Sequence, residues 1–197
     1  MHTSTMLKGL RHAAAGTALA LACGAASAHP GHDVQGLVHG LTHPLGLDHL
    51  LAMVAVGAWS ARALPARRAV LGPVVFMLAL LAGALGGLST GMLPGVEALV
   101  ALSVVLMGAL LAGGSRWSMP MGLGLIGVSA LAHGLAHGAE WPASTSVLSY
   151  VLGFMACTAV LHAAGLSLGL LARRATPRWW SLAGTAVGAA GVFLLTR

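Results

Sequence analysis

Ionisable side chains cluster in two apolar stretches of this sequence, one near the N-terminus and one in the second half. A charged group costs several kcal/mol in a lipid-facing position, so these residues are candidates for function. No lysine or arginine lies beside them to neutralise the carboxylates, and imidazole with carboxylate is a ligand set for a divalent transition metal. The predicted metal-ligating residues are His39, His43, Asp48, His49, His133, His137, Glu140 and His162.

Four of the histidines form pairs with i, i+4 spacing, His39/His43 and His133/His137. On a helix this spacing puts two imidazoles on one face, close enough to share an ion. The first pair lies at the start of an apolar stretch that is expected to cross a membrane toward the cytoplasm. The second pair lies at the end of a stretch that is expected to cross back. Both pairs are therefore predicted to lie near one side of a membrane, as two walls of one outward-facing vestibule.

The segment HPLGLDH, residues 43–49, is predicted to interrupt its helix. On an unbroken helix His43 and His49 would point about 120° apart. Pro44 removes a backbone donor and Gly46 tolerates a break. A kinked stretch would turn His43 and free carbonyls toward Asp48 and His49, as the broken helices of membrane carriers do at ion sites.

Other polar residues have a second, simpler interpretation. A lone intramembrane histidine such as His162 is more often an interhelical hydrogen-bond partner than a ligand. Glu97 is predicted to cap the start of its helix, and Glu140 with Trp141 fits an interfacial turn. The two clusters, with five polar residues in apolar segments, remain the stronger candidates.

Composition places the chain in the membrane. Only 7% of its 197 residues are charged, 57% are hydrophobic, and the mean hydropathy is +0.88, whereas an ordinary soluble domain has roughly 25% charged residues. The net charge of +6 does not indicate nucleic acid, because the basic residues lie in short loops without an aromatic stacking platform. The expected surroundings are membrane lipid.

Residues 1–28 are predicted to be a cleaved signal peptide, with a basic segment at Lys8 and Arg11, an apolar stretch at 13–23 and the small residues Ala-Ser-Ala at 26–28. An uncleaved anchor and a lipoprotein attached through Cys23 are the alternatives. Cleavage would leave one transmembrane domain, residues 29–197, whose free α-amine, His29 and His32 are predicted to capture metal ions. An inert leader is the alternative for this segment.

Six spans are predicted, at 36–60, 69–89, 95–113, 119–138, 145–171 and 179–196, because each is long enough to cross a membrane. Glycines at four-residue spacing predict a compact, all-α bundle. The loops after the first, third and fifth spans carry seven arginines, and only Arg197 lies on the other side. The positive-inside rule therefore predicts a multi-pass protein of the bacterial inner membrane with both mature termini in the periplasm.

Two motifs in the chain resemble those of the HupE/UreJ family of nickel/cobalt transporters. Residues 43–53, HPLGLDHLLAM, are similar to the family's first-span signature HP-x-G-x-DH-x-LAM, and residues 133–140, HGLAHGAE, to its HG-x-AHG-x-E segment. Gly153-Phe154, Thr158 and Leu161-His162 resemble a later stretch of the family. The resemblance implies uptake of Ni²⁺ or Co²⁺ as a transported substrate, with no permanently bound cofactor, for hydrogenase or urease maturation.

Two further functions would use the same residues. An intramembrane zinc hydrolase would have three histidine ligands, Asp48 as base and Ser129 one turn before His133. A bis-histidine haem protein fits less well, because the histidines cluster on one side in adjacent pairs. A permease, which is not an enzyme, would use the membrane potential or a proton gradient, since the chain carries no P-loop. The sequence leaves open whether the protein is a monomer or a homo-oligomer.

Overall fold

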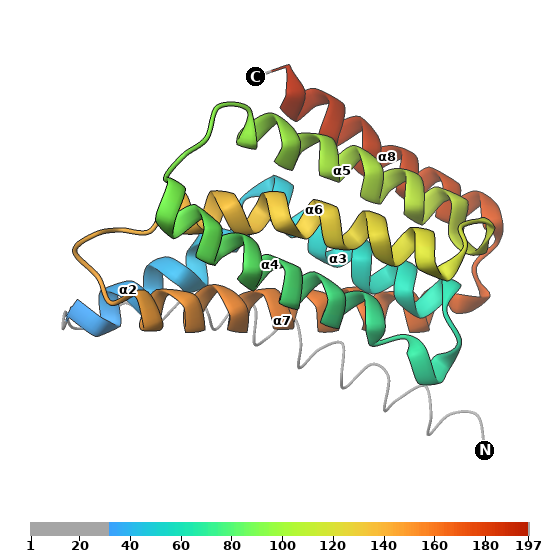
Figure 1. The fold of residues 1–197 in the computed structure, drawn as a ribbon. Helices are drawn as coiled ribbons and strands as arrows, with labels where there is room; N and C mark the ends of the chain where they lie inside the picture. The colour runs from blue at the N-terminus through green and yellow to red at the C-terminus, as the bar shows by residue number, and fades with distance from the viewer. Residues whose placement is uncertain (1–31, 197) are drawn as a thin grey trace.

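The computed structural model of the protein describes residues 32–196, and every regular element in that range is helical (Figure 1). This confirms the all-α prediction, whereas the predicted signal peptide and His29 lie outside the described residues. The helices are α2 (His32–Thr42), α3 (Leu47–Ala63), α4 (Leu71–Thr90), α5 (Val96–Gly113), α6 (Met119–Ala139), α7 (Val147–Leu171) and α8 (Pro177–Leu195). Short 3-10 turns are η1 (His43–Leu45), η2 (Ala66–Arg68), η3 (Gly114–Arg116) and η4 (Ala172–Arg174).

The helices pack in long side-by-side pairs. Helix α4 lies along α6, α5 lies along α8, and α7 lies along both α2 and α3 (Figure 1). Gly83 and Gly87 make the first pairing close, because a methyl group on either would overlap the backbone of α6 near Gly134 and Gly138. The predicted close approach of helices at small residues is therefore confirmed for this pair.

Four helical segments are long and apolar enough to cross a membrane, at residues 66–90, 96–116, 119–139 and 147–174. A fifth span results if the bent pair of 35–45 and 47–63 counts as one. Helix α8 forms where the sixth span was expected, but it is not among these candidates. Its first turn carries Arg178, which makes it less apolar than its neighbours. The structure thus supports a membrane protein with four or five spans, and the sixth is not confirmed.

The predicted interruption near Pro44 is present. Helix α2 passes into η1, and the axes on either side of Gly46 differ by 72°. Pro44 has no N–H to continue the helical ladder, and Gly46 has an extended backbone, with φ −53° and ψ 144°. Its carbonyl then accepts the backbone N–H of Leu50 at 2.9 Å, which begins α3. The break lies inside the first predicted span.

Charged residues separate to opposite ends of the bundle. Successive long helices run in opposite directions, so the turns η2, η3 and η4 all lie at one end (Figure 1). The described carboxylates Asp48, Glu97 and Glu140 all lie at the helix ends opposite these turns. The arginines near the turns are Arg62, Arg67, Arg68, Arg116, Arg173, Arg174 and Arg178.

Candidate metal site

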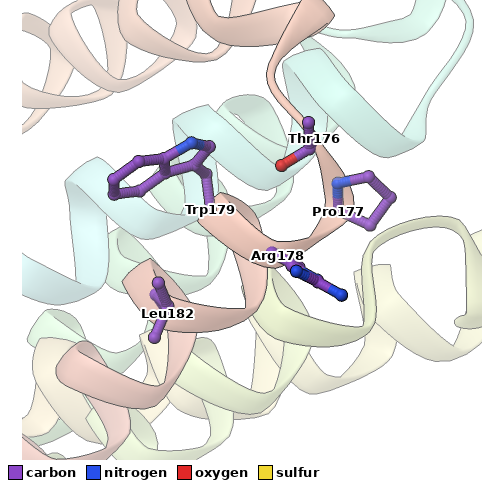
Figure 2. Close-up of a pocket in the computed structure, with 5 residues that line it drawn as sticks. All are labelled: Thr176, Pro177, Arg178, Trp179 and Leu182. Atoms are coloured by element: carbon purple, nitrogen blue, oxygen red, sulfur yellow. The ribbon is translucent and has the colours of Figure 1, made fainter.

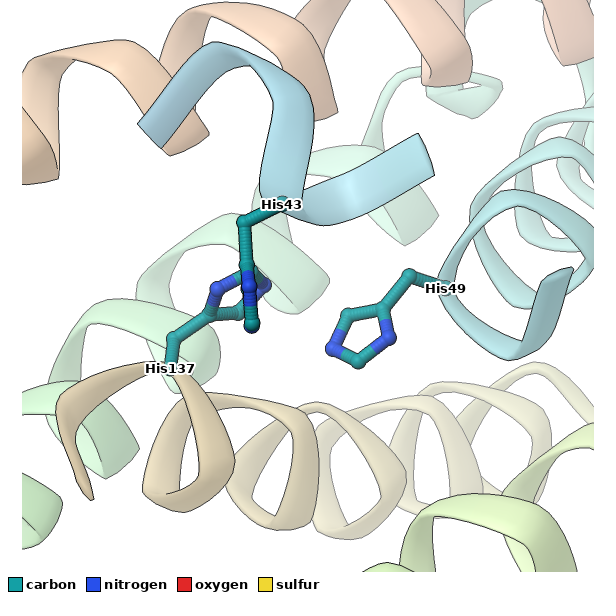
Figure 3. Close-up of side chains that lie close together, drawn as sticks. All are labelled: His43, His49 and His137. Atoms are coloured by element: carbon teal, nitrogen blue, oxygen red, sulfur yellow. The ribbon is translucent and has the colours of Figure 1, made fainter. Parts of the chain in front are cut away.

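Three histidines from three different elements converge at the carboxylate end of the bundle. His43 comes from η1, His49 from the first turn of α3, and His137 from the last turn of α6 (Figure 3). One ligand nitrogen of each lies within 4.8 Å of the other two. The ring centroids are 4.5 Å apart for His43 and His137, 4.7 Å for His49 and His137, and 5.7 Å for His43 and His49. We call these residues the histidine trio, and their donor set suits a divalent transition metal.

The helix break brings the trio together. His43 and His49 lie on opposite sides of Gly46, and the 72° bend lets both rings approach His137. The trio takes one histidine from each predicted i, i+4 pair. An aromatic ring bounds the trio on one side, because Phe154 of α7 stacks on His137 with ring centroids 4.7 Å apart and planes 15° apart. Removal from water strengthens any ion–ligand interaction there.

Asp48 holds His49 in one orientation. Its Oδ1 accepts hydrogen bonds from Nδ1 of His49 at 2.9 Å and from the backbone N–H of His49 at 2.8 Å. A carboxylate only accepts, so Nδ1 carries the hydrogen and Nε2 keeps its lone pair. Nε2 of His49 is buried and has no hydrogen-bond partner among the described residues. This is the carboxylate–histidine arrangement that orients metal ligands in proteins.

Glu140 contributes a second carboxylate at the edge of the trio. It directly follows α6, and its Oε2 lies 2.6 Å from Nε2 of His43. The close contact with His43 holds the pKa of Glu140 below its ordinary value, so this side chain is charged at neutral pH. With Asp48, Glu140 places two negative charges beside the three imidazoles. That is enough formal charge to neutralise one divalent ion.

His133 extends the site inward from the trio. Its ring centroid is 4.5 Å from that of His49, and its side chain is fully buried. Ser103 Oγ lies 2.7 Å from His133 Nε2 and 2.6 Å from the carbonyl of Val100. The hydroxyl has one hydrogen, which goes to the carbonyl, so Nε2 of His133 donates to Ser103. Nδ1 of His133 keeps its lone pair and has no partner among the described residues.

His162 and His133 both lie beside the ring of Phe76. The ring of Phe76 is 5.7 Å from that of His133 and 4.9 Å from that of His162. Nδ1 of His162 donates to the Thr158 carbonyl at 2.8 Å, and Nε2 has no partner in the described part of the chain. His162 is 1% exposed. It is therefore a hydrogen-bond partner through one nitrogen, but within its own helix α7 and not between helices as the simpler interpretation predicted, and it has a second nitrogen available.

The other predicted residues lie outside the trio. His39 is on the exposed side of α2, one turn before the break. His32 begins α2, and its side chain is outside the described residues. Glu97 lies exposed in the first turn of α5, but the N-cap is Gly95 and no side chain caps this helix, so the predicted cap is not seen. Ser129 is buried, and its hydroxyl has no hydrogen-bond partner among the described residues.

Several residues that shape the site were not predicted. Ser103 orients His133, Phe76 contacts both His133 and His162, and the Tyr150 hydroxyl donates to the His137 carbonyl at 3.1 Å. Ser103 is an isolated polar residue in an apolar stretch, which is only weak evidence that it belongs to the site. Phe76 and Tyr150 look like ordinary packing residues in the sequence, and Phe154 was noted only as part of a stretch that resembles the family. Only the packing of distant helices reveals what they contact.

Comparison with known proteins agrees with the motifs. The HupE / UreJ protein family matches residues 17–194 of the chain. Protein HupE of Rhizobium leguminosarum bv. viciae is 39% identical over 175 residues, which cover 86% of this chain and 90% of that protein. No solved structure matches the chain. The resemblance noted in the two histidine motifs is confirmed, and the chain belongs to the HupE/UreJ family.

Proposed function

We propose that the protein is a permease that takes up Ni²⁺ or Co²⁺ across the bacterial inner membrane, and that the histidine trio is its first binding site. The observation that carries this proposal is the convergence of His43, His49 and His137 beside two carboxylates. Nitrogen and carboxylate donors are suited to these ions. The motifs further favour a role in supplying hydrogenase or urease.

The ion would move inward through a series of available nitrogens. From the trio it would pass to Nδ1 of His133, which adjoins His49, and then past Phe76 to Nε2 of His162. A buried polar atom without a partner is destabilising, so such atoms are uncommon unless they serve a function. Lone pairs arranged in sequence allow the ion to exchange ligands stepwise.

Asp48 and Glu140 would make binding favourable in a medium of low dielectric. A divalent ion stripped of water needs compensating charge there, and neither carboxylate pairs with an arginine in the described chain. Inward movement would use the membrane potential, worth about 2.3 kcal/mol per charge per 100 mV. Exchange of protons for metal at the histidines is a second available driving force.

We infer six spans in the membrane, with α2, η1 and α3 forming one broken span and α8 completing the bundle. Helix α8 runs beside α5 along its length. Its C-terminal end lies at the same end of the bundle as the metal site. The arginine-rich turns would face the cytoplasm by the positive-inside rule. The trio, both mature termini and the predicted capture residues His29 and His32 would then face the periplasm.

Uptake of radioactive nickel or cobalt into sealed proteoliposomes tests this function. With an inside-negative potential, the wild-type protein is expected to accumulate the ion, and His137→Ala is expected to reduce the initial rate by tenfold or more. His39→Ala, which removes a histidine outside the trio, should retain uptake. A zinc hydrolase would hold a tightly bound ion and move none, so absence of flux with intact wild-type protein would refute the permease.

A further inference from the structure

Two adjoining cavities lie at the arginine-rich end of the bundle, far from the metal site along the helices. One cavity, of about 370 Å³, is lined by three arginines, Arg62, Arg116 and Arg178, and by Ser115 and Ser181. The other, of about 660 Å³, is lined by Thr176, Pro177, Arg178, Trp179 and Leu182 (Figure 2). Pro177 and Arg178 line both, so the two cavities are neighbours.

The first cavity is strongly positive. Its three guanidinium groups come from α3, η3 and α8, and no described carboxylate pairs with any of them. Arg62 is held in place, because it donates to the Leu111 carbonyl at 2.8 Å and lies over the Trp180 ring at 5.0 Å from its centroid. Guanidinium groups and serine hydroxyls are good donors to phosphate oxygens. The cavity therefore suits an anion with a phosphate group.

The second cavity is mainly apolar. Trp179 is 67% exposed and Leu182 is 60% exposed. Both side chains lie on the same side of Arg178 in the first turns of α8 (Figure 2). Exposed tryptophan beside arginine is typical of the boundary between lipid headgroups and acyl chains. A ligand that occupies both cavities would have an anionic head and an apolar tail.

We propose that the two cavities together form a binding site for an anionic phospholipid. Its phosphate group would lie among Arg62, Arg116 and Arg178, and its acyl chain would lie along Trp179 and Leu182. Basic pockets between helices at the cytoplasmic side of membranes bind such headgroups. One phosphate would bridge α3, η3 and α8, and so would fasten α8 to the rest of the bundle.

Lipid binding to the purified full-length protein tests this site without reference to metal uptake. Native mass spectrometry would count bound phosphatidylglycerol and phosphatidylcholine during titration of each lipid. The wild-type protein is expected to prefer phosphatidylglycerol. Arg116→Gln/Arg178→Gln should lower that preference about fivefold for each arginine removed, since each contributes about 1 kcal/mol. Both arginines are exposed, so folding should be unaffected.

Arg67→Gln/Arg174→Gln is the matched control, because it removes the same charge at the same end and neither residue lines these cavities. This control should keep the preference for phosphatidylglycerol. An equal loss in both double variants, or no preference in the wild type, would overturn the proposal. Trp179→Gln should weaken phosphatidylglycerol binding as well. Displacement of the lipid by an equal concentration of inorganic phosphate would show a site for free anions and also overturn it.

Discussion

At the scale of single residues, hydrogen bonds decide which nitrogen is available in three of the buried histidines, while neither ring nitrogen of His137 has a partner among the described residues. The Asp48 carboxylate fixes His49, Ser103 fixes His133, and the Thr158 carbonyl fixes His162. In each case one nitrogen donates, and the other keeps a lone pair that no described residue uses. Each partner sets the tautomer of its histidine, because in the other tautomer the nitrogen that faces the ion carries a hydrogen and cannot bind it.

The role of Asp48 can be measured through metal affinity. Asp48→Asn removes the charge and weakens the orientation of His49, so Co²⁺ affinity should fall by about 10–100-fold, as loss of such partners typically does. Isothermal titration of the purified protein with Co²⁺ measures this change. Glu97→Gln, at an exposed carboxylate near the same end of the bundle, is the control and should bind normally. Equal affinities for the wild type and Asp48→Asn would contradict the assigned role.

A pair of substitutions separates the two roles of His162. The asparagine amide occupies the position of Nδ1, so His162→Asn keeps the hydrogen bond to Thr158 but removes Nε2. The glutamine amide reaches the position of Nε2 and lacks the Nδ1 group. A ligand role predicts that initial metal uptake falls several-fold more in His162→Asn than in His162→Gln. The reverse order, at equal membrane abundance, would show that His162 is structural only.

At the scale of elements, the break between α2 and α3 makes the trio. Without it His43 would project away from His49, and the two could not both approach His137. The break also accounts for Pro44 and Gly46, since irregular backbone at membrane depth is tolerated only where it is buried in protein or lines a cavity.

Pro44→Ala tests this geometry, since proline offers no side-chain ligand. Restoring backbone hydrogen bonding should straighten the segment, turn His43 from the trio and reduce initial uptake several-fold at equal abundance. Pro120→Ala is the control, because Pro120 lies in the first turn of α6, where proline interrupts no hydrogen bond. Full activity of Pro44→Ala would mean that the break does not depend on Pro44.

The sequence predicted the helical class, the break and the residues of the trio, but not how the histidines group. Helical periodicity pairs His39 with His43 and His133 with His137, because it relates only residues of the same helix. The packing of η1, α3 and α6 instead selects His43, His49 and His137. Phe76 and Ser103 were not found because their importance depends on neighbours from other helices. Local pattern carries little information about such contacts.

At the scale of the whole molecule, close backbone contacts and separated charges organise the bundle. Small residues let α4 approach α6, which places His133 and His137 against the rest of the site. Carboxylates lie at one end and the arginine-rich turns at the other. The two ends therefore suit different ligands, a metal cation at the first and an anionic headgroup at the second.

The close packing of α4 on α6 predicts the effect of adding one methyl group. Gly83→Ala would overlap the Leu131 carbonyl, and such overpacking costs about 1–3 kcal/mol. Gly124→Ala is a matched control on α6, where a methyl group meets open space, and it should stabilise by up to about 1 kcal/mol. Unfolding of the purified protein in a denaturing detergent measures both. Equal stability of the two variants would contradict the packing.

The most direct test of the central claim is X-ray absorption spectroscopy of the nickel-loaded protein. Three histidines within reach of one ion predict a nickel spectrum with three imidazole ligands. His43→Ala and His137→Ala should each reduce this number to two or abolish binding, and His39→Ala should leave it unchanged. A spectrum without imidazole ligands, or one that neither trio substitution alters, would contradict the histidine trio as the metal site.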